Sequence, residues 1–391
     1  MMLVTVTKIS SVAEFENYKE EWDSFIEEEH RFLGEQFPYY YLLFTRYLLL
    51  YCNYYFTFFP DRKMHFLMLR KGKCVVALLP LQVYEKKLGF VRVKLMRFIG
   101  EYGFGMPLDL MWTRREGLMS AQEMEIFLSE HLEQEKIAML VLAPILKDSP
   151  YMLFLQEKNL LDRCHYRHQY RSLKHYFIPN RLYENYEALS LAEFSQSVRR
   201  RYRKAMDYKR EGAHVRLEIF NHDREKDYER LFADLLKQSQ DTNKAELSSN
   251  GVDADTAEAT MLYQMIKELY PRGEATLLFN YYNEQLAAIM LAFHPKTQGR
   301  LFAYYVSANR ESSGGTGTLL FYKLCEYAYN QGYEYTDFMT GWDYLQRFTS
   351  KFQKSEELVF IRKNILGTLI YILLEAKKYW KKGEYRLEQK F

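Results

Sequence analysis

In the second half of the chain, some apolar residues alternate with polar ones and others form short continuous runs. Both patterns predict strands, and helices are predicted between them. The runs Ala275–Tyr282 and Gln285–His294 predict two strands. They are joined at Asn283-Glu284, and this spacing indicates a hairpin, because Asn tolerates the positive φ of a tight turn. The other predicted elements are strands at 216–220, 301–307, 335–339 and 358–362 and helices at about 223–239, 254–270, 317–331 and 343–353.

Part of this order recurs in the first half of the chain. The predicted elements there are a hairpin of 65–69 with 73–83, a strand at 90–99, a helix at about 120–134 and a strand at 137–142. The shared order suggests duplication. It predicts an α+β protein of two tandem domains, each a mixed, mostly antiparallel sheet flanked by helices. The expected bounds are 1–180 and 190–363, followed by a basic amphipathic helix at 364–391.

Composition narrows the class of protein. With 391 residues, 48% hydrophobic and 27% charged, the chain has the profile of a folded globular protein. The net charge of +3 is too small to indicate a nucleic-acid or membrane partner for the protein as a whole. The N-terminus does not resemble a signal peptide, and no apolar segment has the length needed to span a bilayer. A cytoplasmic protein is therefore expected. The four single cysteines have neither zinc nor redox spacing, and no metal is expected; they are Cys52, Cys74, Cys164 and Cys325.

A glycine-rich loop between a predicted strand and a predicted helix is the most informative motif, at 307–320. Glycines allow several backbone N–H groups to converge, and a helix N-terminus adds partial positive charge, so the loop suits a pyrophosphate. The loop lacks the Lys-Ser/Thr ending of a P-loop and the spacing of a dinucleotide fingerprint. The alternative is an ordinary helix start behind a flexible loop.

These elements resemble a known family. The order from about 216 to 362 looks like the GNAT acetyltransferase fold, and the chain more closely resembles the CelD-like acetyltransferases, which are related to the Fem-type transferases. The likeness is carried by Ser197–Gly212, Gly315–Leu320 and Asp337–Phe348. It implies that acetyl-CoA or another acyl-CoA is the co-substrate. The residues implied to bind it are Ser307, Arg310, Gly315, Thr316, Gly317 and Thr318.

The sequence departs from the family pattern at two places. The usual turn is matched only at Gly315, and Leu345 occupies the position after Tyr344 where the family often has a basic residue, so that Arg347 or Lys351 would substitute. The implied reaction is direct attack of an amine or hydroxyl on a thioester, which needs a base, an oxyanion donor and an acid. Asp343 is the candidate base, and Tyr344 is the candidate acid or a hydroxyl that positions the acceptor. Asp343 could instead, or in addition, cap the following helix.

Basic residues cluster between 199 and 210 on a predicted helix. A solvated helix is one reading, and an anionic acceptor is the other, with nucleic acid ranked below because the cluster stands alone. The expected acceptor-binding residues are Arg200, Arg203, Tyr102 and Arg347. The first domain is expected to shape the acceptor site, in a cleft between the domains. Surface positions are expected for His165, His168 and His175.

The predicted function is transfer of an acetyl or other acyl group to an amine or hydroxyl of a polar metabolite or a cell-envelope or polysaccharide precursor. One alternative is a Fem-type aminoacyl transferase, although its long inserted helix pair is not visible. Another is a non-catalytic module that binds acyl-CoA or a membrane surface. The tail at 364–391 either packs on the body or a second subunit, or makes a peripheral membrane contact. The sequence leaves the oligomeric state open.

Overall fold

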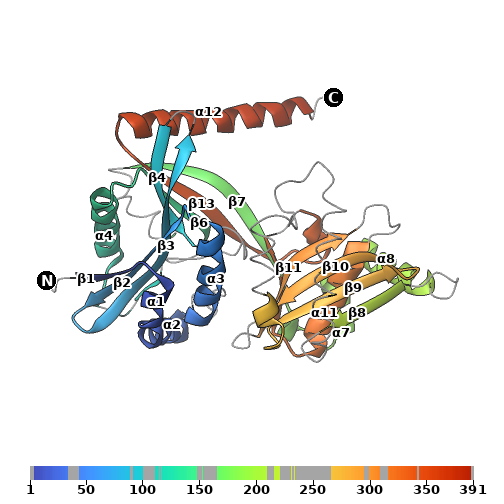
Figure 1. The fold of residues 1–391 in the computed structure, drawn as a ribbon. Helices are drawn as coiled ribbons and strands as arrows, with labels where there is room; N and C mark the ends of the chain where they lie inside the picture. Colours follow the sequence, from blue (N-terminus) through green and yellow to red (C-terminus); the bar gives the residue numbers. More distant parts are fainter. Residues whose placement is uncertain are drawn as a thin grey trace. The chain divides into compact units, whose positions relative to one another are not determined.

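The computed structural model describes residues 4–33, 44–88, 91–99, 111–113, 115, 117–147, 152, 165–208, 215–220, 230, 233, 266–294, 299–308, 316–340 and 343–388. The chain forms two compact units (Figure 1). Unit 1 contains Met1–Glu101, Met106–Leu173 and Lys354–Phe391, and unit 2 contains Tyr102–Gly105 and Lys174–Gln353. Each unit has a mixed, mostly antiparallel sheet with helices, which confirms the predicted α+β class.

The sheet of unit 1 has the strand order β1-β2-β3-β4-β6-β13. All neighbours are antiparallel except β4 and β6, which are parallel because the helix α4 connects them. The strands are β1 Val4–Ile9, β2 Lys63–Lys71, β3 Cys74–Leu88, β4 Val91–Phe98, β6 Met139–Leu146 and β13 Phe352–Arg362, and β5 Met111–Trp112 pairs with β3. The helices are α1 Val12–Glu16, α2 Lys19–Leu33, α3 Thr45–Phe58, α4 Ala121–Gln134 and α12 Ile365–Glu388.

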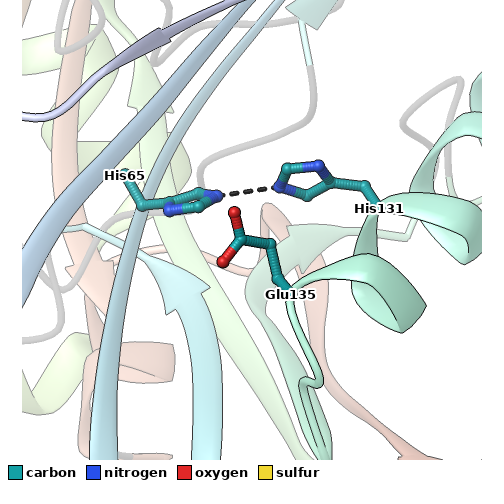
Figure 2. Close-up of side chains that lie close together, drawn as sticks. All are labelled: His65, His131 and Glu135. Carbon is teal, nitrogen blue, oxygen red and sulfur yellow. Dashed lines mark hydrogen bonds between the residues drawn. The ribbon is translucent and has the colours of Figure 1, made fainter.

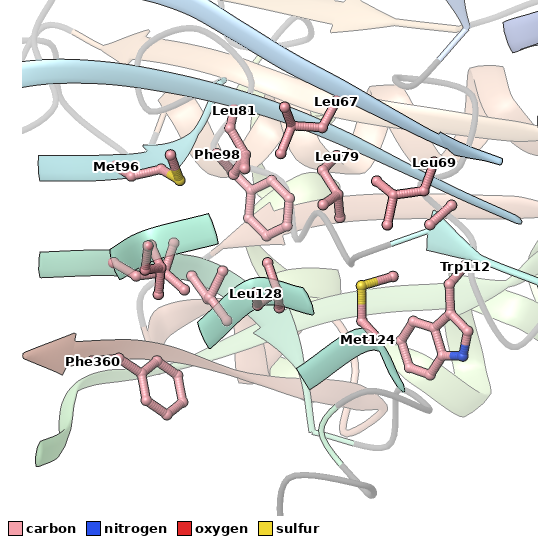
Figure 3. Close-up of a cluster of buried hydrophobic side chains, with 14 of the residues drawn as sticks. Leu67, Leu69, Leu79, Leu81, Met96, Phe98, Trp112, Met124, Leu128 and Phe360 are labelled. Atoms are coloured by element: carbon pink, nitrogen blue, oxygen red, sulfur yellow. The ribbon is translucent and has the colours of Figure 1, made fainter. Parts of the chain in front are cut away.

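The helix α4 forms and packs for reasons that are visible in its sequence. Ser120 and Glu123 make a capping box, in which each side chain accepts a hydrogen bond from the other residue's backbone N–H. Met124, Leu128 and Leu132 then follow at intervals of four and are buried against the leucines of β2 and β3 (Figure 3). Each such side chain contributes about 1.5–3 kcal/mol when it is fully buried. This core is what holds α4 against the sheet of unit 1.

The sheet of unit 2 has the order β7-β12-β11-β10-β9-β8. Its strands are β7 His165–Pro179, β8 Val215–Phe220, β9 Ala275–Tyr282, β10 Gln285–Phe293, β11 Arg300–Ala308 and β12 Tyr335–Thr340. Its helices are η3 Asn180–Leu182, α7 Tyr186–Glu193, α8 Gln196–Tyr208, α11 Thr316–Asn330 and η5 Asp343–Arg347. The predicted hairpin is confirmed, because Asn283 and Glu284 have φ values of 50° and 61° between β9 and β10.

The two halves exchange a strand. The strand after β6 is β7, and its second half pairs with β12 in unit 2. The strand after β12 is β13, and it pairs with β6 in unit 1. The units are therefore built from interleaved segments, whereas the bounds expected from the sequence, 1–180 and 190–363, run linearly along the chain.

Several local expectations differ from the structure. The helix expected at 343–353 is only the short 3-10 helix η5, because β13 begins at Phe352. Most of the helices expected at 223–239 and 254–270 lies outside the described residues. The expectation of surface histidines is wrong: His165, His168 and His175 lie on β7 and are buried. Polar residues on a strand can be buried when sheet neighbours and helices cover both faces, which the local sequence does not reveal.

Candidate functional site

The parallel strands β11 and β12 pair over only a short length. Their ladder joins Arg300 with Tyr335, Leu301 with Thr336 and Phe302 with Asp337. Both strands are described to their ends, and β11 runs on to Ala308 while β12 runs on to Thr340. On its other side β11 stays paired with β10 up to Ala308. The two central strands of unit 2 therefore part after Phe302 and Asp337.

A bulge in β12 explains this parting. The ladder between β12 and β7 shifts register between Asp337 and Thr340. Within this interval Met339 has a φ of 56°, a left-handed conformation that costs a non-glycine residue about 1–2 kcal/mol. The backbone N–H of Met339 donates to Oδ1 of the buried Asp337 at 2.6 Å. This hydrogen bond offsets part of the strain and fixes the direction in which β12 leaves the sheet.

The same carboxylate fixes the paired end of the two strands. Nη1 of Arg300 donates to Oδ2 of Asp337 at 2.7 Å, and both side chains are buried. The guanidinium carbon of Arg300 lies 4.4 Å from the ring centroid of Tyr335. Removing one partner of a buried pair leaves an uncompensated charge, which typically costs about 3–5 kcal/mol. Asp337 thus couples the start of the ladder to the bulge that ends it.

The helix α11 begins beside the end of β11. A Cβ atom placed on Gly317 would lie 3.4 Å from Cβ of Ala308, so the first turn of α11 approaches the last residue of that strand closely. Gly317 and Thr318 belong to this turn, and Thr318 is half-buried there. Arg310 and Gly315 lie outside the described residues, as do the side chains of Ser307 and Thr316. The structure therefore places two of the six expected co-substrate residues at a helix N-terminus next to the parted strands.

Tyr344 lies in η5 and contacts α11. Its ring meets that of Phe321 edge-on at 5.9 Å between centroids, and 38% of the residue is exposed. Desolvation by its surroundings raises the pKa of Tyr344 to about 12. The phenol is therefore a neutral hydrogen-bond donor near pH 7. Asp343 begins η5, but its side chain lies outside the described residues.

The residues around Tyr344 explain why Leu345 stands where the family often has a basic residue. Leu345 is buried in the core of unit 2, so this position serves packing. Lys351 is engaged elsewhere, because its ammonium group pairs with Glu193 and donates to the hydroxyl of Tyr183 at 2.9 Å. Arg347 is exposed, and its carbonyl accepts from the N–H of Ser195 at 2.7 Å, which ties η5 to the segment before α8. Of the two basic residues considered, Lys351 is therefore held in an ion pair with Glu193, whereas Arg347 is exposed.

The basic helix α8 packs on α11 through one face. Val198 and Ala205 are buried, and the ring of Tyr202 stacks on Tyr322 with centroids 3.7 Å apart. Arg200 and Arg203 are exposed, three residues apart on the helix. Tyr102, the remaining expected acceptor residue, lies outside the described residues. The structure thus joins the basic helix to the helix that begins at the expected co-substrate turn.

Sequence reasoning did not single out Arg300, and it did not foresee the role of Asp337. One signal was available. Asp337 stands within Thr336-Asp337-Phe338-Met339, a buried strand in which a lone carboxylate needs a partner. The partner, however, belongs to another strand, so only the pairing register identifies it.

A second group of ionisable side chains lies in unit 1 (Figure 2). Nε2 of His65 on β2 lies 2.8 Å from Nε2 of His131 on α4, and both residues are buried. Glu135 follows α4, and one ligand atom from each of the three residues lies within 4.8 Å of the others. Burial and then the charge of Lys8 lower the pKa of His65 to about 4, and burial also lowers that of His131.

The surroundings of this group favour a hydrogen-bonded pair over a metal site. Zn–N bonds of about 2.0–2.1 Å in a tetrahedral site hold two nitrogens roughly 3.3 Å apart, farther than the pair observed here. Glu135 is bound to Nζ of Lys8 at 2.8 Å and of Lys94 at 3.4 Å. Its single negative charge is therefore outweighed by two ammonium groups, which would repel a divalent cation. The expectation that the protein holds no metal remains a prediction.

Comparison with known proteins finds a family model that matches part of the second half of the chain. Residues 196–347 match the family model described as "Acetyltransferase (GNAT) domain". No curated protein matches the chain in sequence. The matched segment includes β11, β12, α11 and the basic helix α8.

The chain is also similar to several solved structures at low sequence identity. A tandem GNAT protein from the clavulanic acid biosynthesis pathway is 11% identical, with 92% of this chain and 99% of that chain covered and a TM-score of 0.49. FemX is 12% identical, with 80% and 91% covered and a TM-score of 0.49. L-PGS from Bacillus licheniformis is 11% identical, with 75% and 85% covered and a TM-score of 0.44. Such low similarity carries neither activity nor substrate over to this chain.

Proposed function

We propose that the protein transfers an acetyl or other acyl group from acyl-CoA to an amine or hydroxyl of a polar acceptor. The observation that carries this proposal is the parting of β11 and β12 directly beside the N-terminus of α11. Parted strands leave room for an extended ligand, and the helix start attracts its phosphates. The match of residues 196–347 to a GNAT acetyltransferase domain supports the proposal. A cytoplasmic, bacterial protein of the CelD-like type is part of this proposal.

In this proposal the acyl-CoA lies with its pyrophosphate at the first turn of α11. Gly317 and Thr318 belong to that turn, and the expected loop residues Arg310 and Gly315 precede it in sequence. Gly317 has no side chain, so the phosphates can approach its backbone closely. The acyl end then lies toward the parted strands, where backbone N–H groups of β11 would polarise the thioester carbonyl.

The chemistry follows from a direct attack. The acceptor nitrogen or oxygen forms a bond to the thioester carbon, the C–S bond breaks, and the acceptor loses a proton while the departing thiolate gains one. Asp343 accepts the first proton in this proposal. Tyr344 supplies the second in this proposal, because its hydroxyl is protonated at neutral pH.

The acceptor is proposed to be anionic, such as a sugar phosphate or a cell-envelope or polysaccharide precursor. Arg200 and Arg203 are exposed on α8, and the face of α8 that carries Tyr202 is packed against α11. Arg347, also exposed, lies on η5 with Tyr344. Guanidinium groups suit phosphate and carboxylate recognition. Arg200, Arg203, Arg347 and Tyr102 are the proposed acceptor-binding residues.

Two measurements on the full chain test the proposal. Calorimetry with acetyl-CoA should show binding, and release of the CoA thiol should follow when amine or hydroxyl acceptors are supplied. Binding without thiol release from any acceptor would favour a non-catalytic acyl-CoA module. Transfer from aminoacyl-tRNA with no response to acyl-CoA would favour a Fem-type reaction instead. Absence of acyl-CoA binding would refute the proposal.

A further inference from the structure

The helix α12 carries apolar side chains on two opposite sides near its start. One side packs on unit 1, where Ile370 is buried. The apolar residues of that side are Leu366, Ile370, Tyr371 and Leu374, and they contact a cluster formed by Tyr84, Val93, Leu95, Met139, Val359 and Ile361. This contact covers one side of the helix only.

Polar contacts with β7 fix which side of α12 faces the body. The hydroxyl of Tyr166 lies 3.1 Å from Oγ1 of Thr368, and its ring stacks on Tyr371 with centroids 4.7 Å apart. Nδ1 of the buried His168 lies 2.5 Å from a carboxylate oxygen of Glu375. Rotation of α12 about its axis would break these contacts, so the opposite side of the helix stays turned away from unit 1.

That opposite side is apolar and exposed. Ile365 is 86% exposed, and Leu369, Ile372 and Leu373 are 56%, 56% and 68% exposed. Intervals of four, three and one residues place these four side chains, here called the α12 stripe, along one face of a helix. A surface helix normally keeps polar residues on the face away from the core, so a second apolar stripe indicates a further partner.

The sequence of the same helix points to the nature of that partner. Lys377, Lys378, Lys381 and Lys382 follow the stripe, Trp380 stands among them, and no acidic residue lies between the first and last of these lysines. Within the described residues no helix has the length and hydropathy needed to cross a bilayer. An apolar stripe followed by lysines and a tryptophan is typical of a helix that lies in the plane of an anionic membrane surface.

We propose that α12 is a membrane-surface anchor, with the α12 stripe inserted among the acyl chains and the lysines near anionic headgroups. A second copy of the chain would cover the stripe but would leave the lysine cluster unexplained, whereas an anionic bilayer accounts for both features. Docking through this face leaves the contacts of α12 with β7 intact. The anchor does not depend on the proposed acyl transfer.

Co-sedimentation of the full chain with vesicles tests the anchor. We expect binding to phosphatidylcholine vesicles that contain phosphatidylglycerol, weaker binding to phosphatidylcholine alone, and loss of the difference at high salt. The variant Leu369→Ser/Ile372→Ser/Leu373→Ser should bind at least about tenfold more weakly, because it removes most of the inserted apolar surface. Its melting temperature should match that of the wild type, since the three side chains are exposed.

Two further variants distinguish anchoring through α12 from vesicle binding through another surface of the protein. The variant Leu182→Ser/Leu191→Ser removes leucines of unit 2 that are 66% and 58% exposed, and it should leave vesicle binding unchanged. Replacing the four lysines by Gln should abolish the preference for phosphatidylglycerol. Absence of vesicle binding, or equal binding by the stripe variant, would overturn the proposal. The proposal would also be overturned if light scattering detected a dimer of the wild type that the stripe variant does not form, and the wild type did not bind vesicles.

Discussion

Arg300, at the start of the ladder between β11 and β12, forms a buried ion pair at 2.7 Å with Asp337, at the end of the same ladder. The second oxygen of Asp337 holds the backbone of Met339 in its left-handed conformation. One carboxylate therefore fixes both the pairing of the two strands and the bulge that separates them. The proposed thioester position depends on this carboxylate without any contact between Asp337 and the co-substrate.

The variant Asp337→Asn should be strongly destabilised, because the amide can still accept from Met339 but leaves the charge of Arg300 buried and uncompensated. We expect a loss of about 3–5 kcal/mol in the free energy of unfolding, measured by urea denaturation. As a control, Glu268→Gln breaks the pair of Glu268 with Arg272, in which both side chains are about half exposed, and should change stability by less than about 1 kcal/mol. An Asp337→Asn protein as stable as the control would contradict this role.

The variant Gly317→Val should weaken acetyl-CoA binding about tenfold or more, since its side chain would occupy the approach to the helix N-terminus. The fold should survive, because the added Cβ meets only Cβ of Ala308, at 3.4 Å. Calorimetry gives the affinity, and a thermal melt checks the fold. Gly317→Ala should have an intermediate effect. Unchanged affinity in a folded Gly317→Val protein would remove the site from this turn.

The variant Tyr344→Phe should lower acyl transfer roughly a hundred- to ten-thousand-fold without changing acetyl-CoA affinity. Phe keeps the ring contact with Phe321 and removes only the hydroxyl. The rate is measured as release of the CoA thiol in the presence of an acceptor that the wild type acylates, and the affinity for acetyl-CoA is measured by calorimetry. A rate equal to that of the wild type would show that the proton comes from another group.

The variant Asp343→Asn should lower the rate by a similar factor if Asp343 is the base. If Asp343 only caps η5, Asn caps almost equally well and the rate of thiol release hardly changes. Acetyl-CoA affinity, measured by calorimetry, should stay the same in either case. A near-normal rate would therefore exclude Asp343 from the mechanism and leave the co-substrate site in place.

The variant Arg200→Glu/Arg203→Glu should raise the KM for an anionic acceptor about tenfold or more, because both guanidinium groups are exposed on α8. Affinity for acetyl-CoA should stay the same. Arg272→Glu, an exposed charge reversal of the same kind, serves as the control. Tight, salt-sensitive binding of random duplex DNA by the wild type would argue instead for a nucleic-acid role of α8.

The free energy of unfolding should fall as the pH drops from about 6.5 to about 4. His65 and His131 bind protons less readily when folded than when unfolded, where a histidine pKa is about 6.5. Their contribution is fully present above that pH and is lost toward the folded pKa of His65, about 4. The carboxylate of Glu135 moderates this effect, and the charges of Lys8 and Lys94 strengthen it.

The loss should be on the order of 1–3 kcal/mol, measured by urea denaturation at a series of pH values. The variant His65→Gln/His131→Gln should reduce the slope of this part of the profile, while His175, whose pKa burial lowers to about 3, keeps part of it. The matched variant Arg31→Gln, at an exposed position, should keep the wild-type slope. Equal slopes in wild type and the double histidine variant would contradict the assignment, and a rise in melting temperature on adding Co²⁺ would reopen the question of a metal.

The sequence by itself determined the elements that local patterns specify. The hairpin turn at Asn283-Glu284, the end of α11 before Gly332 and the start of α4 near Ser120 all depend on residues a few positions apart, and the structure contains them as predicted. The role of Tyr344 as a proton donor, which the family resemblance implied, stays a prediction.

Only the tertiary structure decided which distant segments meet. The exchange of β7 and β13 between the sheets, the burial of His175 opposite Thr340, and the pairing of Arg300 with Asp337 join residues far apart along the chain. Propensity and periodicity carry information about near neighbours, whereas strand pairing is selected by the packing of whole sheet faces. For the same reason, the sequence showed an apolar start and a basic end in 364–391, but only the packed fold showed which face of α12 remains exposed.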